Sequence, residues 1–184
     1  NICQGFGMDC NPELIAAAQN NTAKLGFSDR FALHTGELAD TRFLENLRME
    51  ASPVQLVMAN PPWRLVGSGR FPATEARRKA LFGDKGTFPL FASAASSLLE
   101  EDGRFACIIS PDRLQDMLAA LDGAGLTPYL LQYIHKQKTS PATFVLIEAR
   151  KGAHAKPSVA EPIALYGPER FFTLESLAFC PFLR

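Results

Sequence analysis

Short apolar runs alternate along this chain with longer segments in which apolar residues recur at helical spacing, and this alternation limits the possible folds most strongly. Val54–Ala59 is a typical apolar run. Asn11–Leu25 is a typical helical segment, because Asn11 is a favourable N-cap, Pro12 suits the first helical position and Glu13 suits the first turn. The alternation predicts an α/β fold, an open sheet with helices on both faces. Such sheets bind ligands beyond the carboxyl ends of their strands.

The expected elements cover most of the chain. Strands are expected at Ile2–Met8, Phe31–His34, Val54–Ala59, Arg104–Ser110, Pro128–His135, Ala142–Ala149 and Ile163–Tyr166. Helices are expected at Asn11–Leu25, Asp40–Glu50, Thr74–Leu81, Thr87–Glu100 and Pro111–Gly123. The strand Val54–Ala59 is almost continuously apolar, which is typical of a strand covered on both faces.

The connection between the strands Pro128–His135 and Ala142–Ala149 is too short, at about six residues, for a parallel crossover. These two strands should therefore form an antiparallel hairpin at one edge of the sheet. The length of 184 residues and a hydrophobic fraction of 47% favour one domain that covers residues 1–184.

Two acids follow expected strands at positions where a nucleotide cofactor binds. Asp9 ends the strand Ile2–Met8, and an acid there accepts hydrogen bonds from ribose hydroxyls. The neighbouring Cys10 belongs to the same predicted cofactor site. Glu37 follows the next strand, where it would lie beside an adenine amino group, with Leu38 against the ring. The alternatives are a capping or turn role for Asp9 and a solvated turn for Glu37.

The segment Asn60-Pro61-Pro62-Trp63 directly follows the strand Val54–Ala59 and is the strongest motif. Two prolines stiffen the backbone and remove two N–H donors, so nearby carbonyls are free to accept. An Asn side-chain oxygen and a proline carbonyl can hold both hydrogens of an amino group and aim its lone pair at a methyl donor. Trp63 offers a face on which an extruded base can stack. The alternative is a stiff turn followed by a core tryptophan.

A basic segment follows the motif. Its six cations and two acids give a local charge of +4 in a chain of net charge zero. Together with Phe71 and Phe82 it can clamp phosphates, and the alternative is a solvated loop. The candidate RNA-binding residues are Arg64, Arg70, Arg77, Arg78, Lys79 and Lys85. Four more cations near the hairpin are better explained by its solubility, namely Lys136, Lys138, Arg150 and Lys151.

Composition excludes several other classes of function. The four cysteines form no CxxC pair and mostly lie in apolar runs, so we expect reduced core thiols in a cytoplasmic protein. Cysteine nucleophile chemistry is not expected, since burial raises a thiol pKa. The three scattered histidines indicate no metal site. No run approaches the roughly 18 apolar residues of a membrane helix, so no membrane association is expected.

Taken together, these motifs resemble class I S-adenosylmethionine-dependent methyltransferases. That resemblance rests on Gly7–Asn21, Gly36-Glu37, the Asn60-Pro61-Pro62-Trp63 motif and Gly103–Ser110. A narrower resemblance, to the bacterial tRNA (adenine-N6) methyltransferases that act on valine tRNA, rests on Asn60–Arg78, Phe88–Pro111 and Tyr166–Phe182. It implies a Rossmann-like sheet, S-adenosylmethionine as cofactor and transfer to adenine N6 in tRNA, with no metal. The adenine nitrogen would attack the sulfonium methyl, and S-adenosylhomocysteine would leave.

The resemblance assigns the cofactor ribose to Asp9, the cofactor adenine to Glu37 and Leu38, and the target amino group to Asn60 and the Pro61 carbonyl. Asn60 also belongs to the predicted cofactor site. The chain departs from the family in two places. Trp63 stands where Tyr or Phe is more usual. The first strand and the Gly-rich loop that cradles the methionine end of the cofactor are not found, and Gly5 and Gly7 precede the wrong helix to replace that loop. Because the chain begins without Met, we expect the natural protein to start earlier.

Three alternative functions stay open at this point. A protein glutamine-N5 methyltransferase has a similar motif, and a generic small-molecule or O-methyltransferase has the same fold. A non-catalytic RNA- or partner-binding module, with a degenerate cofactor site, would explain the missing Gly-rich loop. The intact Asn60-Pro61-Pro62-Trp63 motif opposes that last interpretation.

Overall fold

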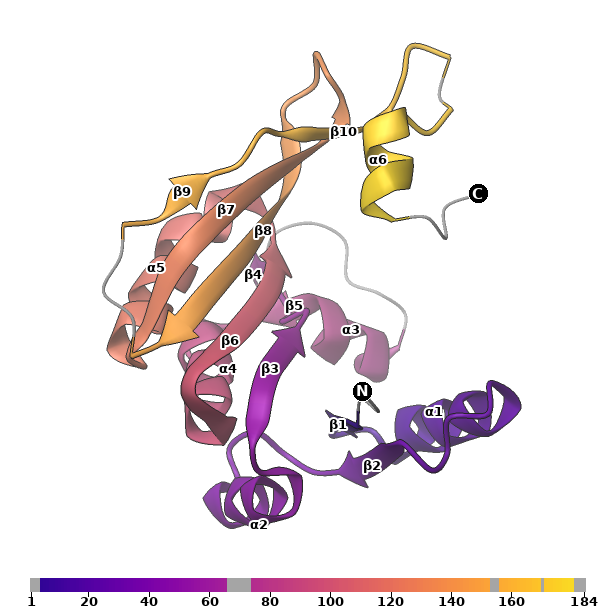
Figure 1. Ribbon diagram of the computed structural model, residues 1–184, viewed down its shortest axis with the longest axis vertical. Helices are drawn as coiled ribbons and strands as arrows, with labels where there is room; N and C mark the ends of the chain where they lie inside the picture. The colour runs from indigo at the N-terminus through magenta and orange to yellow at the C-terminus, as the bar shows by residue number, and fades with distance from the viewer. Residues whose placement is uncertain (1–3, 66–73, 153–155, 170, 181–184) are drawn as a thin grey trace. The chain divides into compact units, whose positions relative to one another are not determined.

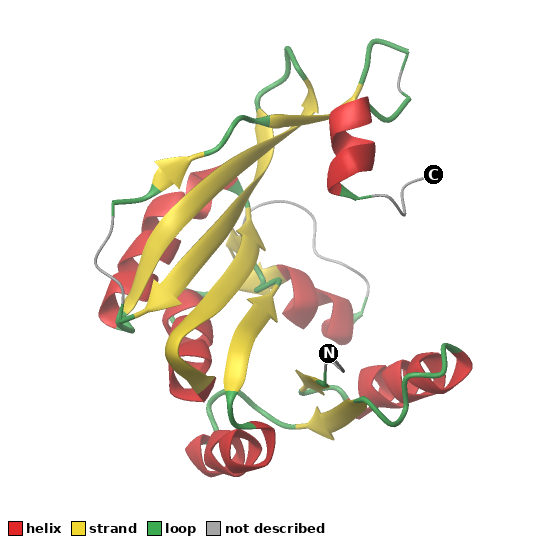
Figure 2. Ribbon diagram, viewed as in Figure 1, coloured by secondary structure: helices red, strands yellow, loops and turns green. Residues whose placement is uncertain are grey.

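The structure is a computed structural model that describes residues 4–65, 74–152, 156–169 and 171–180. It divides into two compact units, Asn1–Ser52 and Pro53–Arg184. Both units combine helices with strands, as the sequence predicted (Figures 1 and 2).

The first unit contains two strands and two helices. These are β1 (Gly5–Asp9), α1 (Pro12–Lys24), β2 (Phe31–Thr35) and α2 (Thr41–Ala51). The strands β1 and β2 pair in parallel, so their carboxyl ends lie at the same edge. Asn11 caps α1 as expected, because its side chain accepts a hydrogen bond from the Glu13 N–H at 2.9 Å. Asp40 caps α2 in the same way through the N–H of Phe43 at 3.0 Å.

The second unit is built on a six-stranded mixed sheet. Its main strands are β3 (Val54–Ala59), β6 (Leu99–Ile109), β7 (Leu126–Gln137), β8 (Ala142–Lys151), β9 (Ser158–Val159) and β10 (Ile163–Tyr166). The short strands β4 (Arg64–Leu65) and β5 (Phe82–Gly83) pair separately. Its helices are α3 (Glu75–Leu81), α4 (Thr87–Leu98), the 3₁₀ turn η1 (Pro111–Arg113), α5 (Leu114–Gly123) and α6 (Leu174–Phe179).

The strand order of the main sheet is β10-β7-β8-β6-β3, with β9 also paired to β7. Strand β3 pairs with β6 in parallel, whereas β8 runs antiparallel to both β6 and β7. The antiparallel hairpin β7-β8 is therefore confirmed. It is not the outermost part of the sheet, because β10 and β9 add to the free side of β7 (Figure 1).

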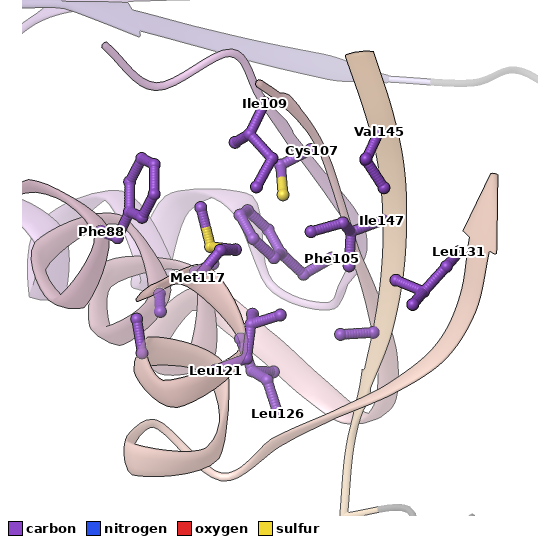
Figure 3. Close-up of a cluster of buried hydrophobic side chains, with 14 of the residues drawn as sticks. Phe88, Phe105, Cys107, Ile109, Met117, Leu121, Leu126, Leu131, Val145 and Ile147 are labelled. Carbon is purple, nitrogen blue, oxygen red and sulfur yellow. The ribbon is translucent and has the colours of Figure 1, made fainter. Parts of the chain in front are cut away.

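The main core fills the space between α4, α5 and one face of the sheet. Phe88 from α4, Met117 from α5, and Phe105, Ile109 and Val145 from β6 and β8 are at most 1% exposed, and Figure 3 shows several of these side chains together. Neighbouring side chains on the same strands are only partly buried. In this unit the helices of the core thus lie on one face of the sheet.

Strand β3 also departs from the expectation. Its apolar sequence predicted cover on both faces, yet Leu56 is 41% and Met58 is 76% exposed. Val57 and Ala59 pack against the core, so β3 is buried on one face only. The prediction was wrong because an apolar run shows only that its side chains tolerate burial, not that both faces of the strand are covered. Within the described residues β3 pairs with β6 alone.

The helix predicted at Thr87–Glu100 ends at Leu98, and the following residues already belong to β6. The change of direction depends on Asp102 and Gly103. Asp102 has a φ of 61°, a left-handed conformation that Asp tolerates better than most residues. A Cβ on Gly103 would lie 2.8 Å from the Glu100 carbonyl oxygen. Lys151 donates to the carbonyls of Ser96 and Leu99, so it stabilises the end of α4.

Candidate active site

The first group of predicted residues lies at the carboxyl ends of β1 and β2. Asp9 is the last residue of β1 and stands opposite Thr35 in the parallel ladder. The next residue after β2, Gly36, donates its backbone N–H to the Asp9 carbonyl oxygen at 3.1 Å. Glu37 therefore follows one residue beyond the point that joins the two strand ends. The sequence predicted that Asp9 and Glu37 belong to one cofactor site, and this local geometry is consistent with that prediction.

The Asp9 side chain already performs the turn role that the sequence left as an alternative. Its Oδ1 accepts a hydrogen bond from the Asn11 N–H at 2.8 Å, which shapes the entry into α1. The carboxylate remains partly exposed. One oxygen is thus used by the turn, and no described residue donates to the other oxygen. A bound diol can still be held by the second oxygen.

The other three predicted cofactor contacts near the ends of β1 and β2 differ in exposure. Cys10 and Glu37 are exposed, whereas Leu38 is half-buried. Cys10 lies in the turn between β1 and α1, outside the apolar runs that predicted core thiols, whereas Cys107 is buried as expected. Gly36 is required here by packing, since a Cβ would come within 2.4 Å of the Phe43 ring.

The two glycines of β1 serve the pairing of the sheet. A Cβ on Gly5 would lie 2.5 Å from the Phe31 ring, and one on Gly7 would lie 2.7 Å from the Leu33 side chain. Both positions are therefore packing positions against β2. This agrees with the prediction that Gly5 and Gly7 do not supply a loop for the methionine end of a cofactor.

The Asn60-Pro61-Pro62-Trp63 motif begins directly after β3, in the second unit. The last strand residue, Ala59, pairs with Cys107 of β6, so the motif leaves the sheet at the carboxyl end of a parallel pair. Asn60 is exposed, and its side-chain amide makes no hydrogen bond to another described residue. Pro61 is fully buried. The motif thus presents an unoccupied amide on an anchored backbone.

The Trp63 side chain is buried more deeply than would be expected of a residue whose only role is to stack on a base. Its ring lies against the main core and meets the Phe144 ring edge-on, with 6.2 Å between the centroids. The Arg64 guanidinium lies over the ring at 5.3 Å from its centroid. Stacking of a target base on that face requires Arg64 to move aside. The base-stacking role of Trp63 therefore stays a prediction, beside the core role that the sequence left as an alternative.

The backbone after the motif is held by the short pair β4-β5. Arg64 stands opposite Phe82 and Leu65 opposite Gly83. A Cβ on Gly83 would lie 2.6 Å from the Pro62 carbonyl oxygen, so this position accepts only glycine without moving the motif. Sequence reasoning missed Gly83, although a glycine directly after the buried Phe82 was the available signal.

A second residue that sequence reasoning missed is Arg113, at the end of η1. It is 3% exposed, and its Nη1 donates to the Trp63 carbonyl oxygen at 2.8 Å. Its Nε donates to Asp116 Oδ2 at 2.7 Å, and its guanidinium lies 4.5 Å from the centroid of the Phe88 ring. The only sequence signal was an acid three residues after an arginine at the start of a helix.

The candidate RNA-binding residues fall into three places. Arg64 belongs to β4, while Arg77, Arg78 and Lys79 are exposed residues of α3, and Lys85 is exposed after β5. The sixth residue, Arg70, lies outside the described residues. The acid nearest to Lys85 is committed to the start of α4, since Asp84 accepts hydrogen bonds from the Gly86 N–H and the Thr87 hydroxyl.

Other chemistry finds little support in the described part of the chain. No group of three or more His, Cys, Asp or Glu side chains there is placed to hold a metal ion. Burial raises the pKa of the Cys107 thiol to about 12, so this core cysteine stays protonated and is not a nucleophile. Among the described helices, none has both the length and the apolar character needed to cross a membrane.

Part of the chain is similar in sequence to curated proteins. No family model matches the chain. Two curated tRNA1(Val) (adenine(37)-N6)-methyltransferases, from two strains of Porphyromonas gingivalis, are each 32% identical to it over 113 residues. The match covers 60% of this chain and 42% of each relative, so the chain spans about two fifths of the length of the curated relatives it matches.

Solved structures establish the fold. A predicted O-methyltransferase from Agrobacterium tumefaciens has a TM-score of 0.71 at 17% identity, over 100% of this chain and 88% of that chain. A putative rRNA-methylase from Clostridium thermocellum has a TM-score of 0.51 at 20% identity, over 79% of this chain and 75% of that chain. The chain has the Rossmann-like class I methyltransferase fold and resembles the tRNA (adenine-N6) methyltransferases, as its sequence predicted.

Proposed function

We propose that the protein is an S-adenosylmethionine-dependent methyltransferase that modifies an exocyclic amino nitrogen, with adenine N6 in tRNA as the target. The observation that carries the proposal is the Asn60 amide, exposed and without a hydrogen-bond partner among the described residues, at the carboxyl end of a parallel strand. The 32% identity to two tRNA adenine methyltransferases supports the same chemistry. In this proposal both units belong to one catalytic domain.

The residues at the ends of β1 and β2 fit the nucleoside part of S-adenosylmethionine. The partly exposed carboxylate of Asp9 accepts a ribose hydroxyl, and the exposed Glu37 accepts the adenine amino group. Leu38 and Cys10 line the same place. The cofactor supplies a methyl group activated on a sulfonium. Its methionine end requires a Gly-rich loop, and Gly5 and Gly7 are packing residues that do not provide one.

Asn60 and the proline backbone orient the acceptor nitrogen. The Asn60 side-chain oxygen and the Pro61 carbonyl accept the two amino hydrogens, which directs the nitrogen lone pair out of conjugation with the ring. Burial of Pro61 keeps the second acceptor in place. Positioning of this kind is a large source of rate enhancement when the leaving group is already good. The reaction needs no strong general base from the chain.

An RNA substrate is supported by the charge that surrounds the motif. Arg64 follows Trp63 directly, and the exposed cations of α3 and Lys85 follow on the same segment of chain. Cations arranged beside a base-binding pocket hold phosphates without regard to sequence. Such a substrate places the activity in the cytoplasm.

One competing function is favoured by a specific observation. One solved structure that covers the whole chain is a predicted O-methyltransferase, so a hydroxyl acceptor is the main rival to an amino nitrogen. An oxygen acceptor does not need two hydrogen-bond acceptors beside it. The Asn60-Pro61 arrangement therefore favours nitrogen.

The deciding experiment measures transfer of a labelled methyl group from S-adenosylmethionine to total tRNA, ribosomal RNA, protein and small-molecule extracts. It uses both the 184-residue chain and the complete product of its gene. Nuclease digestion and mass spectrometry then identify the modified nucleoside. We expect N6-methyladenosine from the tRNA fraction.

The other results separate the alternatives. Label in methylglutamine would assign a protein substrate, and label in an ether would assign the O-methyltransferase. Calorimetry with S-adenosylmethionine addresses the non-catalytic alternative. If the complete gene product bound no cofactor and transferred no label, the proposed function would be wrong.

A further inference from the structure

A buried arginine connects the motif to the end of the neighbouring strand. Arg113 belongs to η1, which follows β6, and Trp63 follows β3, so the contact joins segments that are 50 residues apart in the chain. The donor is the Nη1 of Arg113, and the acceptor is the backbone carbonyl oxygen of Trp63, at 2.8 Å. We propose that Arg113 is a positioning residue, which fixes the backbone of Asn60-Pro61-Pro62-Trp63 so that Asn60 meets the acceptor nitrogen. This inference rests on the proposed function.

The surroundings of Arg113 explain why its charge tolerates burial. With 3% of its surface exposed, the guanidinium needs hydrogen-bond partners, because an unpaired buried charge is strongly unfavourable. Asp116 accepts its Nε–H at 2.7 Å from the next turn of helix. The ring of Phe88 provides an aromatic face at 4.5 Å. The planar group is thus held in one orientation, which directs a remaining N–H toward Trp63.

The motif depends on this contact because its own residues supply few hydrogen bonds that could hold its backbone. Pro61 and Pro62 have no backbone N–H, so neither residue can donate a hydrogen bond that would hold the turn. Upstream, the anchor is the pairing of Ala59 with Cys107. Downstream, the hydrogen bond from Arg113 to the Trp63 carbonyl comes before the β4-β5 pair begins. Since proline fixes its φ angle, holding the two ends of the turn also restricts Asn60.

A merely structural role for Arg113 would affect stability and nothing else. A positioning role affects the turnover number while cofactor affinity stays unchanged, because the proposed contacts to the cofactor nucleoside come from other residues. The exposed Asp122 of α5 provides a matched control, because no described residue makes a hydrogen bond to its side chain. Asp122→Asn removes one acidic charge from the same helix and leaves both hydrogen-bond partners of Arg113 in place.

The test compares Arg113→Met, Arg113→Lys and Asp122→Asn with the unaltered chain. Trp63 is the only tryptophan, so tryptophan labelled with ¹³C at its carbonyl carbon gives a single resonance that reports directly on this hydrogen bond. The second measurement is kcat and KM for methyl transfer, with the cofactor Kd from calorimetry. Thermal unfolding shows which variants fold.

We expect the carbonyl resonance of Arg113→Met to move upfield and its kcat to fall about 10- to 100-fold, as for the loss of one hydrogen bond to a charged group. The cofactor Kd should not change. Arg113→Lys keeps one donor and should restore part of the kcat, and Asp122→Asn should match the unaltered chain. An unchanged carbonyl resonance together with an unchanged kcat in Arg113→Met would overturn the proposal.

Three further results are decisive in other ways. If Arg113→Met does not fold, Arg113→Lys decides, and a folded Lys variant with unaltered resonance and kcat overturns the proposal. If the unaltered protein methylates a hydroxyl, the proposed function fails, and the same variants test positioning in that reaction. If no substrate is methylated, the proposed function fails, and an unshifted resonance in a folded variant still overturns the role of Arg113.

Discussion

Gly36 and Asp9 are joined by a backbone hydrogen bond of 3.1 Å from the Gly36 N–H to the Asp9 carbonyl oxygen. This bond continues the parallel ladder one step past the last paired residues of β1 and β2. It leaves the Asp9 side chain on the turn into α1 and places Glu37 at the end of the neighbouring strand. The two proposed contacts to the cofactor nucleoside therefore depend on a single local fold.

The first prediction separates the two roles of Asp9. Asp9→Asn keeps an oxygen that can accept the Asn11 N–H, but it removes the negative charge that favours ribose hydroxyls. We expect cofactor affinity to fall about 10- to 100-fold with little loss of stability. Asp9→Ala should lose the same affinity and about 1 kcal/mol of stability in addition. Calorimetry and thermal unfolding measure the two effects.

The control for Asp9 is Asp29→Asn, which makes the same chemical change at an exposed turn before β2. It should alter neither quantity. Equal affinity of the Asp9→Asn and unaltered proteins for the cofactor would remove Asp9 from the site.

The second prediction concerns the acceptor nitrogen. Asn60→Ala removes an exposed amide that makes no hydrogen bond to a described residue, so it should leave stability unchanged. We expect kcat to fall by at least about 100-fold, with the cofactor Kd nearly intact. The exposed Asn20→Ala in α1 serves as the control. Normal turnover of Asn60→Ala on a confirmed RNA substrate would exclude Asn60 from the mechanism.

The third prediction addresses Gly83. In Gly83→Ala the new Cβ would approach the Pro62 carbonyl oxygen to 2.6 Å, and a backbone atom cannot move aside cheaply. We expect a loss of about 1–3 kcal/mol of stability, together with a lower kcat in the fraction that folds. The matched control is Gly123→Ala, because a Cβ at this end of α5 meets no atom within 4 Å. A Gly83→Ala protein as stable and active as the unaltered one would show that the contact is easily relieved.

Much of the fold follows from local sequence signals. The apolar run Val54–Ala59 became β3 with the predicted bounds, and Asn11 caps α1 as its sequence indicated. The predicted helix Thr87–Glu100 extended too far, into β6, because Leu98 and Leu99 suit either element. The left-handed conformation of Asp102 also leaves no periodic signal in the sequence. Pairing partners and exposure are set by the tertiary structure, which explains why the exposed face of β3 was missed.

The candidate site was predictable where one residue type carries the chemistry and follows a strand. Asp9, Glu37 and Asn60 each occur at such a position, and the structure places each at or just beyond the end of a parallel strand. Arg113 was not predictable, because its role depends on a contact with Trp63 that is 50 residues distant in the chain. The choice between stacking and packing for Trp63 depends equally on long-range neighbours such as Phe144.

The fourth prediction concerns alkaline pH. The Cys107 thiol has its pKa raised by burial from 9.0 to about 12, so between these values the folded state keeps a proton that the unfolded state has lost. This contribution to stability is complete below pH 9 and is lost as pH rises toward 12, by at most about 1.4 kcal/mol per pH unit. Urea unfolding at pH 8, 9 and 10, roughly the start of this window, measures the effect. The free energy of unfolding should fall more steeply with pH for the unaltered protein than for Cys107→Ala. Equal slopes for the unaltered protein and Cys107→Ala would contradict the assignment.

The fifth prediction tests the cations of α3. Arg77 and Lys79 are exposed, and in the proposal they contact phosphates, so their effect on binding should be independent of RNA sequence. Arg77→Ala combined with Lys79→Ala should weaken tRNA binding and reduce the slope of log K against log salt by about one to two. The KM for RNA should rise, whereas kcat at saturating RNA and the cofactor Kd should stay unchanged. Lys24→Ala combined with Arg42→Ala, at exposed positions of α1 and α2, removes the same two charges and is the control. A salt slope that the Arg77 and Lys79 variant does not alter would show that α3 lies away from the RNA.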